Sequence, residues 1–140
     1  MSAPDAIELR PIGTVSSPLT DPAAAPKQGD EGAPEATLVL DDAVLPALDR
    51  TEAGDEVIVI TWLHRGDRTV LRVHPRDDPS RPAEGVFATR SQDRPNPIGL
   101  HRVEVVAIDG NRVRVRPLEA LDGTPVLDLK PVLSAEIGER

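Results

Sequence analysis

The 140 residues of this chain are enough for one domain built around one hydrophobic core. There is no cysteine, which excludes disulfides, thiolate metal sites and cysteine nucleophiles. The net charge of −8 has the wrong sign for a protein whose whole surface binds phosphates, and one Trp, one Phe and no Tyr leave little to stack on bases. We therefore expect no general affinity for DNA.

The first half of the chain alternates loop and strand signals. Residues 18–34 are rich in Pro, Ala and Gly, which predicts a long irregular loop. Residues 35–40 (EATLVL) predict a strand, and residues 55–64 are almost continuously apolar, as in a central strand buried on both faces. Between them we expect one helix within residues 40–54, which is either short or begins at the proline that falls inside this range.

The second half is also dominated by strand signals. Asp-Gly-Asn at 109–111 predicts a hairpin, and residues 111–118 alternate Arg and Val like a strand with one wet face. The segments expected to be strands here are 68–75, 84–90, 101–110 and 111–118. Many short strands and few helices predict a mainly β fold, namely one small antiparallel β-barrel-like domain over residues 1–140 with a few short helices and no additional C-terminal domain.

No apolar run approaches the roughly 20 residues that span a bilayer, and the N-terminus lacks the basic-then-apolar pattern of a signal peptide. We expect a cytoplasmic protein without membrane contact. The charge is uneven, because residues 1–63 hold 12 acids and 3 bases, whereas residues 64–102 hold 8 arginines and 5 acids. An anionic ligand near the second stretch and an ordinary arginine-rich surface are both compatible with this pattern.

The segment 90–101 (RSQDRPNPIGLH) lies inside this basic stretch. Pro95 and Pro97 fix their own φ angles and restrict the residues before them, while Gly99 allows backbone geometry that other residues cannot adopt. From the residues alone, a rigid connection and a ligand-binding loop are equally well supported.

The segment 118–131 (LEALDGTPVLDLKP) predicts a tight turn at Asp122 followed by a strand. That strand places Asp128 and Lys130 on one face, where they form either part of a site or a local ion pair. Elsewhere the chain has no Rossmann glycine fingerprint, no phosphate loop and no Ser-His-Asp order. Its three histidines lack metal-ligand spacing, so we expect no metal site.

Taken together, GVFATRSQDRPNPIGLHRVEVV and LEALDGTPVLDLKP resemble the TsaA-like (TrmO) family of S-adenosylmethionine-dependent tRNA methyltransferases. ELRPIGTVSSP is similar to the opening strand of that family, and PKQG to its Pro-Arg-Gln segment, with Lys27 in place of the usual arginine. VIVITWLHRGD and LRVHPRDD also fall where the family has a strand ending in His and an arginine-bearing stretch. The resemblance covers roughly residues 7–131.

The resemblance implies a small barrel that binds S-adenosyl-L-methionine without a Rossmann sheet, in a homodimer whose cofactor site is close to the subunit interface. His64, Arg90 and Arg94 are the expected polar anchors. The implied cofactor-binding residues are Gln28, His64, Arg90, Ser91, Arg94, Asn96, Pro97, Ile98, Gly99, Leu100, Asp122, Gly123, Thr124 and Pro125. The catalytic candidates are His64 or Asp128, which would remove a proton from the acceptor, and Lys130, which would steady charge on it.

The family's best-known activity is N6-methylation of threonylcarbamoyladenosine beside the tRNA anticodon, and this is the leading expectation. Three departures bear on the acceptor: the chain is acidic, it stops at 140 where longer members carry a further C-terminal domain, and Val132 follows Pro131 where the family usually has Tyr. The alternatives are a small-molecule methyltransferase of the same fold and a non-catalytic binder of the methyl donor.

Overall fold

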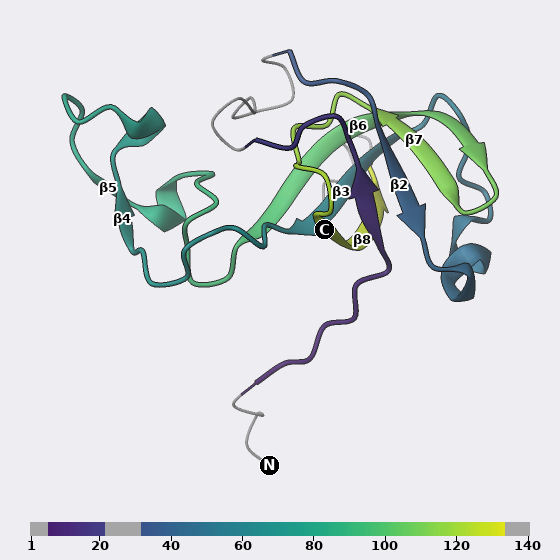
Figure 1. Ribbon diagram of the computed structural model, residues 1–140, viewed down its shortest axis with the longest axis horizontal. Coiled ribbons are helices and arrows are strands. Elements are labelled where there is room, and N and C mark those ends of the chain that lie inside the picture. The colour runs from purple at the N-terminus through teal and green to yellow at the C-terminus, as the bar shows by residue number, and fades with distance from the viewer. Residues whose placement is uncertain (1–5, 22–31, 134–140) are drawn as a thin grey trace.

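The computed structural model describes residues 6–21 and 32–133. Within them, six strands close into an antiparallel barrel in the order β1-β2-β7-β6-β3-β8 (Figure 1). β1 pairs with both β2 and β8, which closes the ring. The mainly β, barrel-like fold expected from the sequence is confirmed. The strands are β1 (Gly13–Ser16), β2 (Ala36–Leu40), β3 (Glu56–Trp62), β6 (Ile98–Asp109), β7 (Arg112–Arg116) and β8 (Pro125–Pro131).

Aliphatic side chains fill the barrel. Successive side chains of a strand point to opposite faces, so the Arg-Val alternation of β7 places Val113 and Val115 inside and the arginines outside. Leu38 and Val59 are likewise fully buried. Each such side chain contributes roughly 1.5–3 kcal/mol through burial. No aromatic residue belongs to the core cluster of the described residues.

The hairpin predicted at 109–111 joins β6 to β7. Gly110 has a φ of 59°, in the left-handed region that glycine adopts without strain. Asn111 Nδ2 donates to the Leu40 carbonyl at 3.0 Å, and the Leu40 N–H donates back to the Asn111 carbonyl at 2.8 Å. The turn is therefore also fastened to β2.

The expected helix is present as the 3-10 helix η2 (Asp42–Leu48), with Pro46 inside it. Val44 and Leu48 pack against the core. A proline interrupts α-helical hydrogen bonding, and a single short 3-10 segment tolerates it better than a long α-helix. None of the helices in the described residues is long and apolar enough to cross a membrane.

Between β3 and β6 the chain leaves the barrel, and residues 63–97 are called the excursion below. Figure 1 shows the excursion projecting from one end of the barrel. It contains β4 (Arg72–Val73) paired with β5 (Glu84–Gly85), and the short 3-10 helices η3 (Pro75–Asp77) and η4 (Val86–Ala88).

The strands expected over 68–75 and 84–90 are thus only two residues long. Within the excursion, all of which is described, only Val86 and Pro97 are buried. A segment with so little apolar surface to pack supports only short pairing.

Candidate functional site

A cleft of about 1630 Å³ opens where the excursion meets the barrel. One wall is the first half of β6, where residues 98–103 pair with β3 along one edge, whereas β7 pairs with β6 only from Glu104 onward. The chain between β7 and β8 and the excursion form the other walls. Small-molecule pockets typically measure roughly 300–1,000 Å³, so this cleft is large enough to hold a small molecule.

The excursion's proline-rich loop is fastened to the end of β3 by Arg68. Arg68 Nε donates to the Pro95 carbonyl at 2.7 Å, and Nη2 donates to Asn96 Oδ1 at 2.9 Å. The guanidinium also lies 5.2 Å from the centroid of the Trp62 ring, within cation–π range. Nothing in the sequence pattern singled out Arg68, because its partners lie far along the chain.

Two further contacts hold the beginning of the excursion against its proline-rich loop. A Cβ on Gly66 would lie 2.3 Å from the Gln92 carbonyl oxygen, so only glycine permits this close crossing. The Asp67 N–H donates to Asp93 Oδ1 at 2.9 Å. Hydrogen bonds from the hydroxyl and the amide of Thr69 hold the pKa of Asp67 below its usual value, so Asp67 is a carboxylate at neutral pH.

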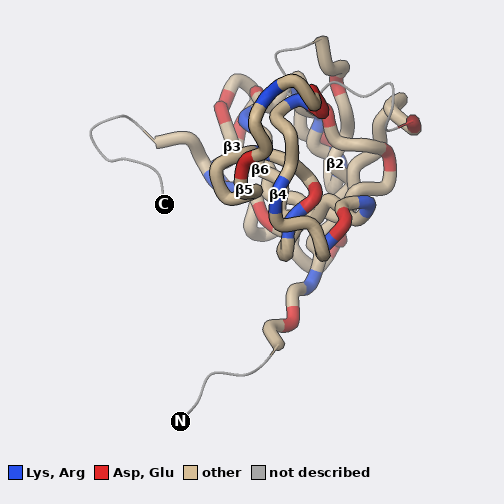
Figure 2. Tube along the Cα trace, turned by 90° about the vertical axis from the view of Figure 1, so that its left-hand side faces the viewer, with Lys and Arg blue, Asp and Glu red and all other residues tan. Residues whose placement is uncertain are grey.

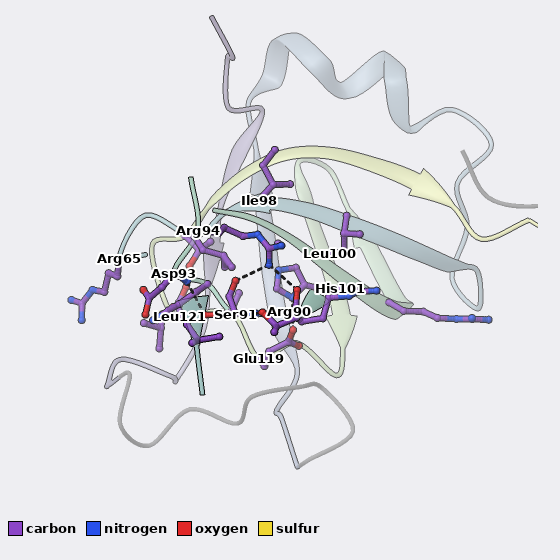
Figure 3. A pocket seen from close by; sticks show the side chains of 18 of the residues that line it. Arg65, Arg90, Ser91, Asp93, Arg94, Ile98, Leu100, His101, Glu119 and Leu121 are labelled. Carbon is purple, nitrogen blue, oxygen red and sulfur yellow. Dashed lines mark hydrogen bonds and ion pairs between the residues drawn. The ribbon is translucent and has the colours of Figure 1, made fainter. Parts of the chain in front are cut away.

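Arg94 and Arg90 differ sharply, although both were expected to anchor a ligand. Arg94 Nη1 donates to the carbonyls of Thr89 and Ser91, both at 2.9 Å, and Nη2 donates to the Val86 carbonyl at 2.9 Å. Arg94 therefore spends three of its five N–H groups on its own loop (Figure 3). Arg90 is exposed, lines the cleft and makes no hydrogen bond within the described residues.

The other predicted cofactor residues are divided. Pro97 is fully buried behind the loop, and Asp122 Oδ1 accepts a hydrogen bond from the Ser17 N–H at 3.0 Å, tying the turn to β1. Gly123 in the same turn and Pro125, the first residue of β8, do not line the cleft, and Gln28 lies outside the described residues. The predicted residues that do line the cleft are His64, Arg90, Ser91, Arg94, Asn96, Ile98, Gly99, Leu100 and Thr124.

Of the three catalytic candidates, only His64 lines the cleft. Asp128 and Lys130 are exposed on the outer face of β8, opposite Ile60 and Ile58 of β3. Asp128 Oδ1 accepts a hydrogen bond from the neighbouring Leu129 N–H at 2.8 Å. In a single chain these two side chains therefore do not meet His64, and their catalytic roles remain predictions.

The structure adds a buried polar chain that the sequence reasoning missed. His101 Nδ1 lies 2.5 Å from Glu119 Oε1, and His101 Nε2 lies 2.7 Å from Thr61 Oγ1. Thr61 and His101 are buried, and the Glu119 side chain is 16% exposed and lines the cleft. A signal did exist for two of them, because Thr61 and His101 each occupy an inward position in line with the inward valines of its strand.

Charge around the cleft is mixed. Figure 2 views the molecule from the side of the excursion and shows Lys and Arg interspersed with Asp and Glu. In Figure 3, Arg65 points away from the other labelled side chains, so not every arginine of the cleft faces its interior. No group of three or more His, Cys, Asp or Glu side chains within the described residues has the arrangement of a metal site.

Comparisons with known proteins identify relatives of this chain. The model of the tRNA-methyltransferase O N-terminal domain matches residues 14–136. A protein of Methanothermobacter thermautotrophicus named as a probable S-adenosyl-L-methionine-binding protein is 44% identical over 125 residues, 89% of each chain. An S-adenosyl-L-methionine-binding protein of Archaeoglobus fulgidus is 41% identical over 122 residues, 87% of this chain and 86% of its own.

Solved structures show the same similarity. The crystal structure of TrmO from Pseudomonas aeruginosa superposes with a TM-score of 0.70 at 31% identity. The match covers 91% of this chain and 56% of the crystallised one. The chain therefore spans just over half the length of that structure.

Proposed function

Because this chain belongs to the family of the tRNA-methyltransferase O N-terminal domain, we propose that it is an S-adenosylmethionine-dependent methyltransferase with its methyl-donor site in the cleft. The observation that carries the proposal is the convergence there of Arg90, the loop held by Arg68, and the first half of β6. These segments are the ones on which the sequence resemblance rests.

The residues of the cleft suit the polar ends of such a donor. Arg90 is a cation with no hydrogen bond inside the described residues, as a partner for a carboxylate would be. Among the described residues, the edge of β6 facing away from β3 has no strand partner before Glu104, so its backbone groups are available to the edge of an adenine ring. β6 is fixed by its pairing in the barrel, and the residues on either side of Arg90 are held by the hydrogen bonds from Arg94 to the carbonyls of Thr89 and Ser91.

S-adenosylmethionine supplies an activated methyl group when bound. Transfer of a methyl group demands alignment more than covalent help, so the useful property of the protein is a loop ordered in advance. Pro95, Pro97 and the Arg68 hydrogen bonds provide that order without a ligand. His64, exposed in the cleft, is the candidate group for taking a proton from the acceptor.

We propose tRNA carrying N6-threonylcarbamoyladenosine as the acceptor. Residues 64–102 carry a net charge of +3 in a chain of net −8, so this stretch, part of which lines the cleft, is the part of the sequence most favourable to phosphates. The test is incubation of the protein with methyl donor and threonylcarbamoylated tRNA, followed by mass spectrometry of the nucleosides. A mass gain of one methyl group on the modified adenosine is expected.

The matched variants are Arg90→Ala in the cleft and Arg112→Ala, on the exposed face of β7. Only the first should lower donor binding and turnover. Absence of any methylated nucleoside, with the donor still raising the melting temperature, would contradict tRNA as the acceptor and leave donor binding intact.

A small-molecule acceptor is the second candidate. It is favoured by the mixed charge around the cleft, where acids accompany the arginines (Figure 2). Labelled donor incubated with tRNA and, separately, with a tRNA-free small-molecule extract separates the two acceptors, because the label then appears in one fraction only. Label in neither fraction, with donor bound, supports a non-catalytic binder.

We also propose that the protein works as a homodimer. Ile60 and Trp62 of β3 lie opposite Leu100 and Ile98 of β6 on the outer face of the barrel, and Ile98 and Leu100 are 43% and 48% exposed. These four residues form the apolar outer face. Apolar side chains that are paired across strands yet open to water are typical of a subunit interface. Asp128, opposite Ile60, borders this face.

A further inference from the structure

Glu119 is a cleft residue that lies in the segment 118–131 but was not among the site residues expected from the sequence. It lies between β7 and β8, beside Leu121 and Thr124, and all three line the cleft. Figure 3 shows Glu119 next to His101, and Ser91 lines the same cleft. Unlike the exposed acids of the excursion, Glu119 is five-sixths buried, with a side chain that is 16% exposed.

A chain of buried hydrogen bonds holds the Glu119 carboxylate on the side that faces the barrel interior. A carboxylate can only accept, so His101 Nδ1–H donates to Glu119 Oε1 at 2.5 Å. At the other side of the ring, His101 Nε2 and the Thr61 hydroxyl form a hydrogen bond of 2.7 Å. Thr61 is fully buried and His101 is 5% exposed, so both partners are fixed by the core.

Gly99 makes room for this chain. A Cβ on Gly99 would lie 2.5 Å from Thr61 Oγ1 and 2.7 Å from His101 Nε2. Because a side chain at position 99 would meet both Thr61 and His101, glycine there leaves room for their hydrogen bond, and the segment 90–101 thereby contributes to the orientation of Glu119.

The second carboxylate oxygen of Glu119, Oε2, has no hydrogen-bond partner within the described residues and is not buried away from solvent. The cleft therefore contains a fixed acceptor with free lone pairs. Accepting two neighbouring hydroxyl groups is a common use of such a carboxylate in nucleoside sites, where an acid binds the ribose.

Resting on the proposed donor site, we propose that Glu119 accepts hydrogen bonds from the ribose hydroxyls of the methyl donor, and that His101 and Thr61 are positioning residues for it. The placement agrees with the rest of the cleft, since Glu119 lies between the free edge of β6 and the Thr124 turn. In this arrangement the adenine of the donor lies at the β6 edge, its ribose at Glu119 and its carboxylate at Arg90.

The test uses calorimetric titration of the full chain with S-adenosylhomocysteine and with its 2′-deoxy and 3′-deoxy analogues. The wild-type protein should bind at least one deoxy analogue about 10- to 100-fold more weakly than S-adenosylhomocysteine, because a hydrogen bond to a charged group is lost. Glu119→Gln should weaken the binding of S-adenosylhomocysteine by a similar factor. It should bind the affected deoxy analogue about as well as the wild type does.

The matched control is Glu35→Gln, because Glu35 lies on the outside of the barrel, 3.7 Å from Arg114, and away from the cleft. It should keep the wild-type preference for the ribose hydroxyls. His101→Ala, compared at equal foldedness by circular dichroism, should lower the same preference, which a merely structural role would leave unchanged.

Equal affinity of the wild-type protein for all three ligands overturns the ribose assignment while the donor site stands. Unchanged affinity in Glu119→Gln with lost turnover also overturns it and places the role of Glu119 in the transfer step. No binding of S-adenosylhomocysteine by the wild type refutes the proposed donor site itself, and the ribose assignment with it.

Discussion

Replacing Gly99 by alanine is expected to break the polar chain at its most crowded point. The new Cβ would lie 2.5 Å from Thr61 Oγ1, 2.7 Å from His101 Nε2 and 3.1 Å from Leu63 Cδ2. Thr61 is β-branched and stiff about χ1, and the His101 ring is held at both nitrogens, so neither can move aside without losing a hydrogen bond.

The cost follows from two contributions. Overpacking a filled interior typically costs about 1–3 kcal/mol, and losing a buried hydrogen bond costs a similar amount. The two arise from the same contacts and do not add fully, so we expect a loss of about 2–4 kcal/mol in the free energy of unfolding. For a chain of this size that corresponds to a fall of roughly 5–15 °C in melting temperature.

The assay is thermal and urea unfolding of Gly99→Ala beside Gly85→Ala. Gly85 is the matched control because its φ of −61° suits alanine and a Cβ there meets nothing within 4 Å. The double variant Gly99→Ala with Thr61→Ala should lose less than the sum of the single variants, since removing the hydroxyl relieves one clash. A Gly99→Ala protein as stable as Gly85→Ala would refute the reasoning.

Three other changes give separate outcomes. Arg68→Ala should weaken the binding of S-adenosylhomocysteine about three- to tenfold in calorimetry, because the loop must then be ordered on binding. Arg112→Ala should leave this affinity unchanged. Leu100→Glu should convert a dimer to a monomer in light scattering, and a variant that stays dimeric would exclude the apolar outer face as the interface. Leu38→Ala should cost about 2–5 kcal/mol in urea unfolding, because it leaves a cavity in the core, without changing ligand affinity in the folded protein.

Features set by local geometry could be predicted from the sequence. The Arg-Val alternation over 112–116 and the Asp-Gly-Asn turn before it appear in the structure as β7 and its hairpin, because a period of two and a left-handed glycine depend only on neighbouring residues. The short strands of the excursion were overestimated. Their β-branched residues favour extension, yet the segment has almost no buried face to hold a ladder together.

The candidate site depended more on packing across the barrel. The motif strings located the segments, but the orientation of Arg94 toward its own loop required the carbonyls of η4 and its neighbours to converge on it. Asp128 and Lys130 share a face, as predicted, but the pairing of β8 with β3 turns that face outward. The strand period shows that two residues share a face, and it does not show which face meets the cleft.

The sequence by itself determined the strand-rich class, the stiff loop around Pro95 and Pro97 and the family, since these follow from composition, local backbone restriction and long matching strings. Only the tertiary structure decided that Thr61, His101 and Glu119 form one hydrogen-bonded chain and that β6 has an unpaired edge beside it. Thr61 and His101 are 40 residues apart, and they meet because β3 and β6 pair in a register that places Thr61 opposite Gly99. Register between distant strands is a property of the closed barrel, so no local pattern contains it.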